Sequence, residues 1–125
     1  MSISNERRKE LFGLLDDLGA RDRGDLYLVF ATQDESVVED LKADLLDGNN
    51  TLSSDTPEEF ADLIYELREQ KRNWSRRLGK LLIVVEQLTS RNEKQLAVKE
   101  IDDFISACTA PFYREIAANE KSRLE

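Results

Sequence analysis

The sequence predicts an all-α protein: a bundle of roughly five to six amphipathic helices. It forms a single domain over residues 1–125, with one long central helix at about 57–89. Apolar residues recur at steps of three and four along most of the chain, as on helices that bury one face. Gly48 to Asp55 is the clearest loop. Three patterns that resemble helix-capping boxes precede apolar stripes: Thr32–Glu35, Thr56–Glu59 and Asn92–Gln95.

The first helix is predicted over residues 4–18. Its apolar residues share one face because they follow the i, i+3, i+4, i+7 spacing. Gly19 is placed to end the helix. The residues expected on this face are Leu11, Leu14, Leu15 and Leu18.

The segment 25–47 permits more than one structure. Leu26–Ala31 has the composition of a buried strand. No second strand candidate exists to pair with it, so we predict helix. The Thr32–Glu35 box then starts a helix from about Gln33 to Asp47 that ends before Gly48, with Val38, Leu41 and Leu45 inward. A stripe through positions 26, 30, 37, 41 and 45 also permits one longer helix.

The long helix has the strongest start signal in the chain. Thr56 can cap it, Pro57 suits the first helical position, and Glu59 completes the box. The apolar stripe behind this start keeps its phase across Asn73 and Gly79, so we predict one long helix, either straight or kinked. The alternative is a break into two helices near Asn73 or Gly79. The stripe consists of Phe60, Ile64, Leu67, Lys71, Trp74, Leu78, Leu81, Val85 and Leu88. A helix that outruns its own bundle would leave apolar surface for a second copy, so we expect a homodimer.

Two further helices are predicted after the long one. The Asn92–Gln95 box starts the first, and Pro111 starts the second, which runs to about Arg123. We expect Cys108 to be a small buried side chain rather than a reactive thiol. The inward faces carry Ala97, Ile101, Phe104, Ile105 and Cys108, and then Phe112, Ile116 and Ala117.

Residue types that common catalytic sites require are missing from the sequence. The chain has no histidine and one cysteine, which excludes Ser–His and Cys–His catalysis, histidine-ligated zinc and a thiolate cluster within one chain. Its five glycines form no phosphate-binding loop. We therefore predict no catalytic residue, no metal and no cofactor, and a protein that is not an enzyme.

Paired carboxylates leave one enzymatic alternative open. Glu59 and Asp62 are three residues apart, and so are Glu100 and Asp103. Each pair could hold Mg²⁺ on one helix face, an arrangement similar to that of all-α nucleotide pyrophosphohydrolases. Glu59 is already accounted for by its capping box.

Charge is distributed unevenly along a chain whose net charge is −8. Residues 34–66 contain eleven acids and one base, whereas residues 68–80 contain six bases and one acid. We take as candidates for binding a partner protein Asp34, Glu35, Glu39, Asp40, Asp44, Asp47, Glu58 and Asp62. A candidate basic patch consists of Arg68, Arg72, Arg76 and Lys80.

Three interpretations of this asymmetry remain. The acidic and basic helices could face each other inside the bundle or dimer, or the acidic segment could dock a basic protein. Alternatively Arg72, Arg76 and Lys80, spaced by four, could grip a phosphate backbone beside Trp74, as in a dimeric nucleic-acid-associated regulator. Trp74 lies on the apolar stripe, which favours a core position.

We expect a cytoplasmic protein with no membrane partner, because no stretch approaches the ~20 apolar residues of a membrane span and the N-terminus lacks a signal-type apolar run. The single cysteine fits a reducing compartment. In size, acidity and missing catalytic groups the chain resembles bacterial immunity proteins and antitoxins. That resemblance implies an inhibitor that neutralises a basic protein.

Overall fold

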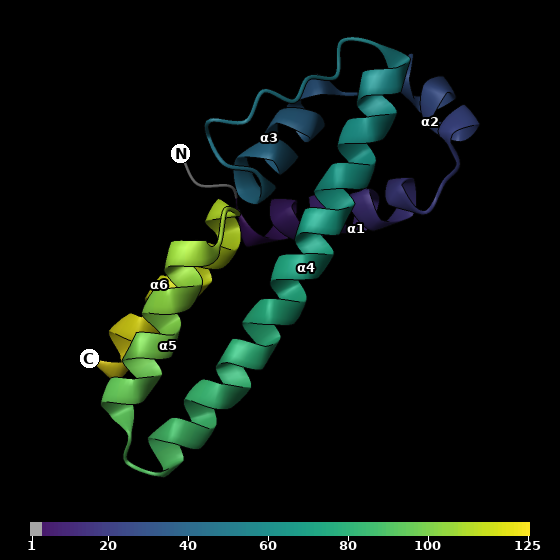
Figure 1. The fold of residues 1–125 in the computed structure, drawn as a ribbon. Coiled ribbons are helices and arrows are strands. Elements are labelled where there is room, and N and C mark those ends of the chain that lie inside the picture. The colour runs from purple at the N-terminus through teal and green to yellow at the C-terminus, as the bar shows by residue number, and fades with distance from the viewer. Residues whose placement is uncertain (1–3) are drawn as a thin grey trace. The chain divides into compact units, whose positions relative to one another are not determined.

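A computed structural model describes residues 4–125, which form six α-helices and no strand (Figure 1). The prediction of an all-α protein with one long central helix is confirmed. That helix, α4, is continuous through Asn73 and Gly79. The helices are α1 (Asn5–Gly19), α2 (Arg23–Phe30), α3 (Glu35–Leu45), α4 (Pro57–Ser90), α5 (Lys94–Ala107) and α6 (Pro111–Leu124).

The chain divides into two compact units. Unit 1 ends at Gln70 and contains α1, α2, α3 and the first part of α4. Unit 2 begins at Lys71 and contains the rest of α4 with α5 and α6. Each unit has buried apolar side chains of its own. The expectation of a single domain stays a prediction.

Unit 1 is built around apolar side chains from all four of its helical segments. Phe60 of α4 packs against Phe30 of α2, with ring centroids 5.8 Å apart. The segment Leu26–Ala31 is helix and terminal turn rather than strand, and Leu26 is fully buried. The largest fully buried side chains here are Leu11, Leu15, Leu26, Leu41, Leu45, Phe60, Leu63, Ile64 and Leu67.

The start of α3 differs from the predicted capping box. Asp34, rather than Thr32, is the N-cap, and its Oδ1 accepts the backbone N–H of Ser36 at 2.9 Å. Thr32 instead donates its hydroxyl to the carbonyl of Val29 near the end of α2. The turn after Phe30 separates α2 from α3, so the alternative of one longer helix is wrong.

The predicted start of α4 is confirmed in its capping half. The backbone N–H of Glu59 donates to Thr56 Oγ1 at 3.1 Å, and Pro57 is the first helical residue. The Glu59 carboxylate accepts a hydrogen bond from the hydroxyl of Ser53. This contact ties the loop before α4 to the helix.

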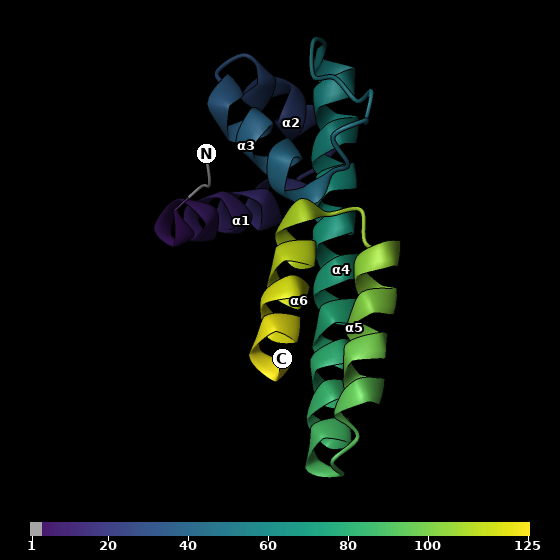
Figure 2. The same cartoon turned by 90° about the vertical axis from the view of Figure 1, so that its left-hand side faces the viewer.

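Unit 2 is a three-helix arrangement in which α5 and α6 lie along α4 (Figure 2). Trp74 is buried and meets Phe104 of α5 edge to face, with ring centroids 5.9 Å apart. The core position predicted for Trp74 is confirmed. Other buried side chains of this unit are Leu78, Leu81, Val85, Ala97, Ile101, Cys108, Ala110, Tyr113 and Ala117.

Asn92 ends α4 instead of starting α5, so the third capping box was wrong. Its φ is 60°, in the left-handed region that asparagine tolerates better than most residues. The N–H of Asn92 donates to Thr89 at 3.1 Å, and the N–H of Glu93 donates to Leu88 at 2.8 Å. This pair of bonds is the Schellman motif, which satisfies the last carbonyls of a helix.

Candidate functional site

The acidic residues predicted to bind a partner all lie in unit 1, yet they differ in accessibility. Asp40 is half-buried and Asp44 is buried, with 6% of its surface exposed. Asp34 caps α3, and Asp47 accepts the backbone N–H of Asn49 in the turn after α3. The exposed members are Asp34, Glu35, Glu39, Asp47, Glu58 and Asp62.

Asp40 and Asp44 form ion pairs with arginines of α1. Arg8 forms a two-pronged ion pair with Asp44, and Arg7 lies 3.7 Å from Asp40. These bases belong to α1 and not to the 68–80 stretch. The two acids are therefore held within the unit 1 fold, and Asp44 is not accessible to a partner.

Asp62 is paired too, although both partners are exposed. Arg23, at the start of α2, donates to Asp62 on α4 and lies over the ring of Tyr65 at 5.6 Å. The hydrogen bond to Asp62, followed by one to Tyr27, raises the pKa of Arg23 further above its ordinary value. The guanidinium therefore stays charged and paired with Asp62.

A groove in unit 1 lies between the loop before α4 and α4 itself. We call it the acidic groove; its volume is about 430 Å³. Three carboxylates lie along one face of α4 at i, i+3 and i+7. Leu63 forms a buried floor, and Leu52 is 41% exposed at the edge. The lining residues are Thr51, Leu52, Ser53, Glu59, Asp62, Leu63 and Glu66.

Neighbouring side chains and backbone groups hold the acidic groove in place. Gln70 donates its amide N–H to Glu66 at 2.8 Å. Lys42, reaching from α3, donates to the carbonyl of Leu52 at 2.8 Å and anchors the loop. The groove is thus a built feature with a negative wall on α4 and apolar contacts below it.

Sequence reasoning found only part of this groove. The sequence predicts Asp62 as a partner-binding residue, and Glu59 as part of a capping box and of a candidate Mg²⁺ pair with Asp62. It makes no prediction for Glu66, and it places Leu52 in a loop. The spacing 59, 62, 66 on one helix face was the available signal. What the sequence could not show was that the 51–53 loop returns to that face.

The candidate basic patch is split by the structure. Arg68 belongs to unit 1, where its Nη1 donates to the carbonyl of Gly19 at 2.9 Å and satisfies the end of α1. The other members, Arg72, Arg76 and Lys80, are exposed on α4 in unit 2. These three remain together on one helix face, with Arg76 near Asn73 Oδ1 at 3.5 Å.

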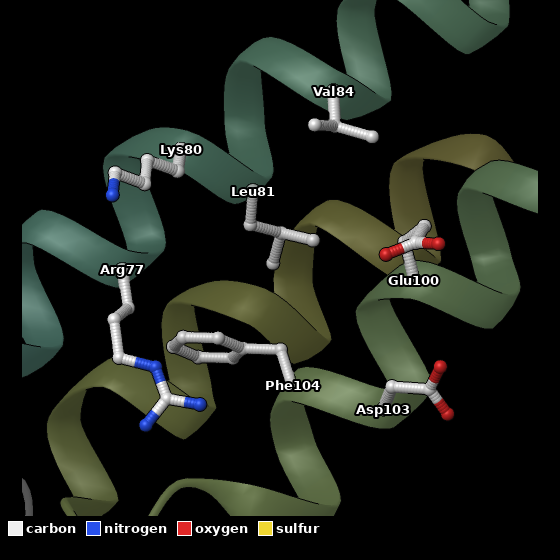
Figure 3. A pocket seen from close by; sticks show the side chains of 7 residues that line it. All are labelled: Arg77, Lys80, Leu81, Val84, Glu100, Asp103 and Phe104. Carbon is white, nitrogen blue, oxygen red and sulfur yellow. The ribbon is translucent and has the colours of Figure 1, made fainter.

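A second groove lies in unit 2 between α4 and α5. We call it the mixed-charge groove; its volume is about 430 Å³ (Figure 3). Arg77 and Lys80 of α4 stand on one side, and Glu100 and Asp103 of α5 on the other. Leu81, Val84 and Phe104 supply the apolar lining. Arg77 also lies over the ring of Trp74, 4.4 Å from its centroid.

Neither predicted carboxylate pair gains a third ligand. Over residues 4–125, no three cysteine, aspartate or glutamate side chains come close enough together to hold a metal ion. Glu59 and Asp62 line the acidic groove, whereas Glu100 and Asp103 line the mixed-charge groove. The two pairs are components of separate grooves.

Cys108 occupies the buried position predicted for it. Its Sγ lies 3.5 Å from the carbonyl of Ala110, and burial raises the pKa of the thiol above its ordinary value.

No helix in the described part of the chain combines the length and the apolar character needed to cross a membrane. Comparisons with protein-family models, curated proteins and solved structures found no match to this chain.

Proposed function

We propose that this chain is a protein-interaction module that acts in the cytoplasm and binds a basic partner protein through unit 1. In this role it would resemble immunity proteins and antitoxins, which neutralise a basic protein by covering it. The observation that carries the proposal is the acidic groove, where three carboxylates and two leucines line one continuous depression.

The chemistry of the groove favours a lysine or arginine side chain as its occupant. Such a side chain has an apolar stem and a charged tip. The stem would cover Leu52 and Leu63 while the tip met Glu59 and Glu66. A cation desolvated between carboxylates at the centre of an interface is the arrangement that gives large losses of affinity on mutation.

Exposed acids around the groove would guide the partner in. Glu35 and Glu39 of α3 and Glu58 at the start of α4 are exposed in the same unit. A surface of one sign speeds the encounter with an oppositely charged protein, and salt screens this effect. We therefore expect the association rate to fall as the salt concentration rises, and to change more than the dissociation rate does.

The test starts from the intact chain, immobilised and exposed to lysate of its native host at low salt. A protein that binds in stoichiometric amounts is identified and then titrated against variants by calorimetry. We expect Glu66→Lys to weaken binding by roughly tenfold or more, by analogy with other buried charge contacts. Glu86→Lys, the same change at an exposed position in unit 2, should leave the affinity unaltered.

Several outcomes would reject the proposal. One is a partner whose binding weakens equally in both variants, or one with an acidic contact surface. Another is steeply salt-dependent binding of nucleic acid that disappears in Arg72→Glu and Arg76→Glu, which would favour the nucleic-acid alternative. A rise in melting temperature with Mg²⁺ that Glu100→Gln removes would favour the enzymatic one.

A further inference from the structure

The mixed-charge groove has two walls of opposite sign that do not neutralise each other. Arg77 and Lys80 are exposed on the α4 wall, and Glu100 and Asp103 are exposed on the α5 wall. Within residues 4–125, none of these four side chains comes within ion-pair distance of an opposite charge. Figure 3 shows the apolar residues Leu81 and Phe104 between the two walls.

Exposed apolar side chains continue the groove along both helices. Val84, in the groove itself, is 36% exposed. Leu96 is 51% exposed and lies one turn before Glu100 on α5. Isolated exposed apolar residues are ordinary, but a group of them beside a groove marks a surface that binds another molecule.

The arrangement of charges indicates what that molecule must carry. An occupant needs an acidic row opposite Arg77 and Lys80, a basic row opposite Glu100 and Asp103, and apolar residues between the rows. The α4–α5 hairpin carries this same pattern. We propose that the mixed-charge groove pairs with the mixed-charge groove of a second copy of this chain.

Charge also selects the symmetry of the pair. The helices α4 and α5 run in opposite directions, joined by the short connection at 91–93 (Figures 1 and 2). A two-fold axis parallel to the hairpin, in the plane of the interface, places α4 of one copy over α5 of the other. The basic wall of each copy then faces the acidic wall of the other, so the contact of opposite charges occurs twice. An axis across the hairpin would set α4 against α4 and oppose like charges.

The resulting interface is an antiparallel four-helix arrangement. The exposed Val84 and Leu96 of each copy lie between the charged rows and become buried. The apolar centre supplies the attraction, while the rim charges fix register and orientation. This inference concerns unit 2 and does not depend on the proposed binding of a basic partner by unit 1.

Charge reversal tests the pairing. Sedimentation equilibrium of the intact chain, measured over a roughly hundredfold range of protein concentration, should show a dimer. Lys80→Glu cancels the positive charge of the α4 wall, where Arg77 remains, and Glu100→Lys cancels the negative charge of the α5 wall, where Asp103 remains. Each variant alone loses the attraction between facing walls and should shift towards monomer. An equimolar mixture of the two should restore the dimer, because one pair of facing walls is then unaltered and the other pair carries opposite charges at positions 80 and 100. Far-UV circular dichroism verifies that both variants are folded.

Glu86→Lys provides the matched control. It makes the same charge change as Glu100→Lys, on the α4 face that carries Leu82 rather than the groove, and should leave the dimer intact. A wild-type chain that stays monomeric at all concentrations overturns the proposal. So does a dimer that both groove variants leave intact, or a mixture of the variants that stays monomeric. A groove that binds only another protein, without self-association, also overturns it.

Discussion

Arg8 and Asp44 form a two-pronged ion pair that joins α1 to α3. Arg8 Nε lies 2.8 Å from one carboxylate oxygen of Asp44, and Nη2 lies 3.1 Å from the other. The side chains are only 13% and 9% exposed. A guanidinium and a carboxylate in this planar geometry match each other well, and both charges are compensated where water is largely excluded.

Removing one partner of this pair should destabilise the protein substantially. Asp44→Ala removes both hydrogen bonds of a largely buried ion pair, so we expect the free energy of unfolding to fall by about 2 to 3 kcal/mol. Asp40→Ala is the control, because the Arg7–Asp40 pair is longer, 3.7 Å, and more exposed. That variant should lose less than about 1 kcal/mol. Urea unfolding followed by circular dichroism measures both, and equal losses would contradict the argument.

Gly19 and Gly13 should respond oppositely to alanine. A Cβ on Gly19 would lie 2.2 Å from Cδ of Arg68, so the Arg68 side chain must move from its hydrogen bond to the Gly19 carbonyl. We expect Gly19→Ala to cost about 1 to 3 kcal/mol. Gly13, in the same helix, has nothing within 4 Å of its added Cβ. Gly13→Ala should therefore stabilise by about 0.5 to 1 kcal/mol. Thermal unfolding of the two variants side by side decides this, and a stabilised Gly19→Ala would disprove the contact.

Asp34 should make the stability of unit 1 depend on acidic pH. Hydrogen bonds from the Ser36 hydroxyl and then from its backbone N–H lower the pKa of Asp34 below its ordinary value. A carboxyl whose pKa is lower when folded adds stability above its unfolded pKa and loses it as pH falls through the folded one. Asp34→Asn keeps the cap without the charge, so its melting temperature should approach that of wild type as pH falls from about 6 to 3. A constant difference across this range would refute the role of the charge.

Cys108 should be protected from thiol reagents while the protein is folded. Its thiol is buried, and burial raises its pKa, so little reactive thiolate forms at pH 8. We expect labelling by a chromogenic disulfide reagent to be slow in buffer and fast in denaturant. Labelling in buffer at the rate of a free thiol would show that α5 and α6 open locally. Because the pKa is higher in the folded state, this group also favours folding less as pH rises above the ordinary thiol value.

The fold was predictable from sequence because most of its helices bury a regular stripe. The core positions of Leu11, Phe60 and Trp74 follow directly from that periodicity. Local polar signals were less reliable, since Thr, Asp and Asn can satisfy the end of one helix or the start of the next. Thr32 and Asn92 both serve the preceding helix, and this choice depends on where the chain turns.

The candidate sites could be predicted only in part. Sequence spacing placed Glu59 and Asp62 on one face, and Glu100 and Asp103 on another. It could not show that Asp44 is paired with Arg8, a residue 36 positions away. Nor could it show that Arg68 ends α1 or that the charges of Arg77 and Glu100 face across one groove. These relationships depend on contacts between helices, which hydrophobic periodicity does not encode.

The packing of Trp74 against Phe104 gives the protein an internal optical probe. Trp74 is the only tryptophan in the sequence and belongs to unit 2, so its fluorescence reports on the packing of α4 against α5 in that unit. Far-UV circular dichroism reports on helices in both units. Comparing the two signals along one denaturation curve therefore distinguishes cooperative unfolding of the whole chain from sequential loss of its halves.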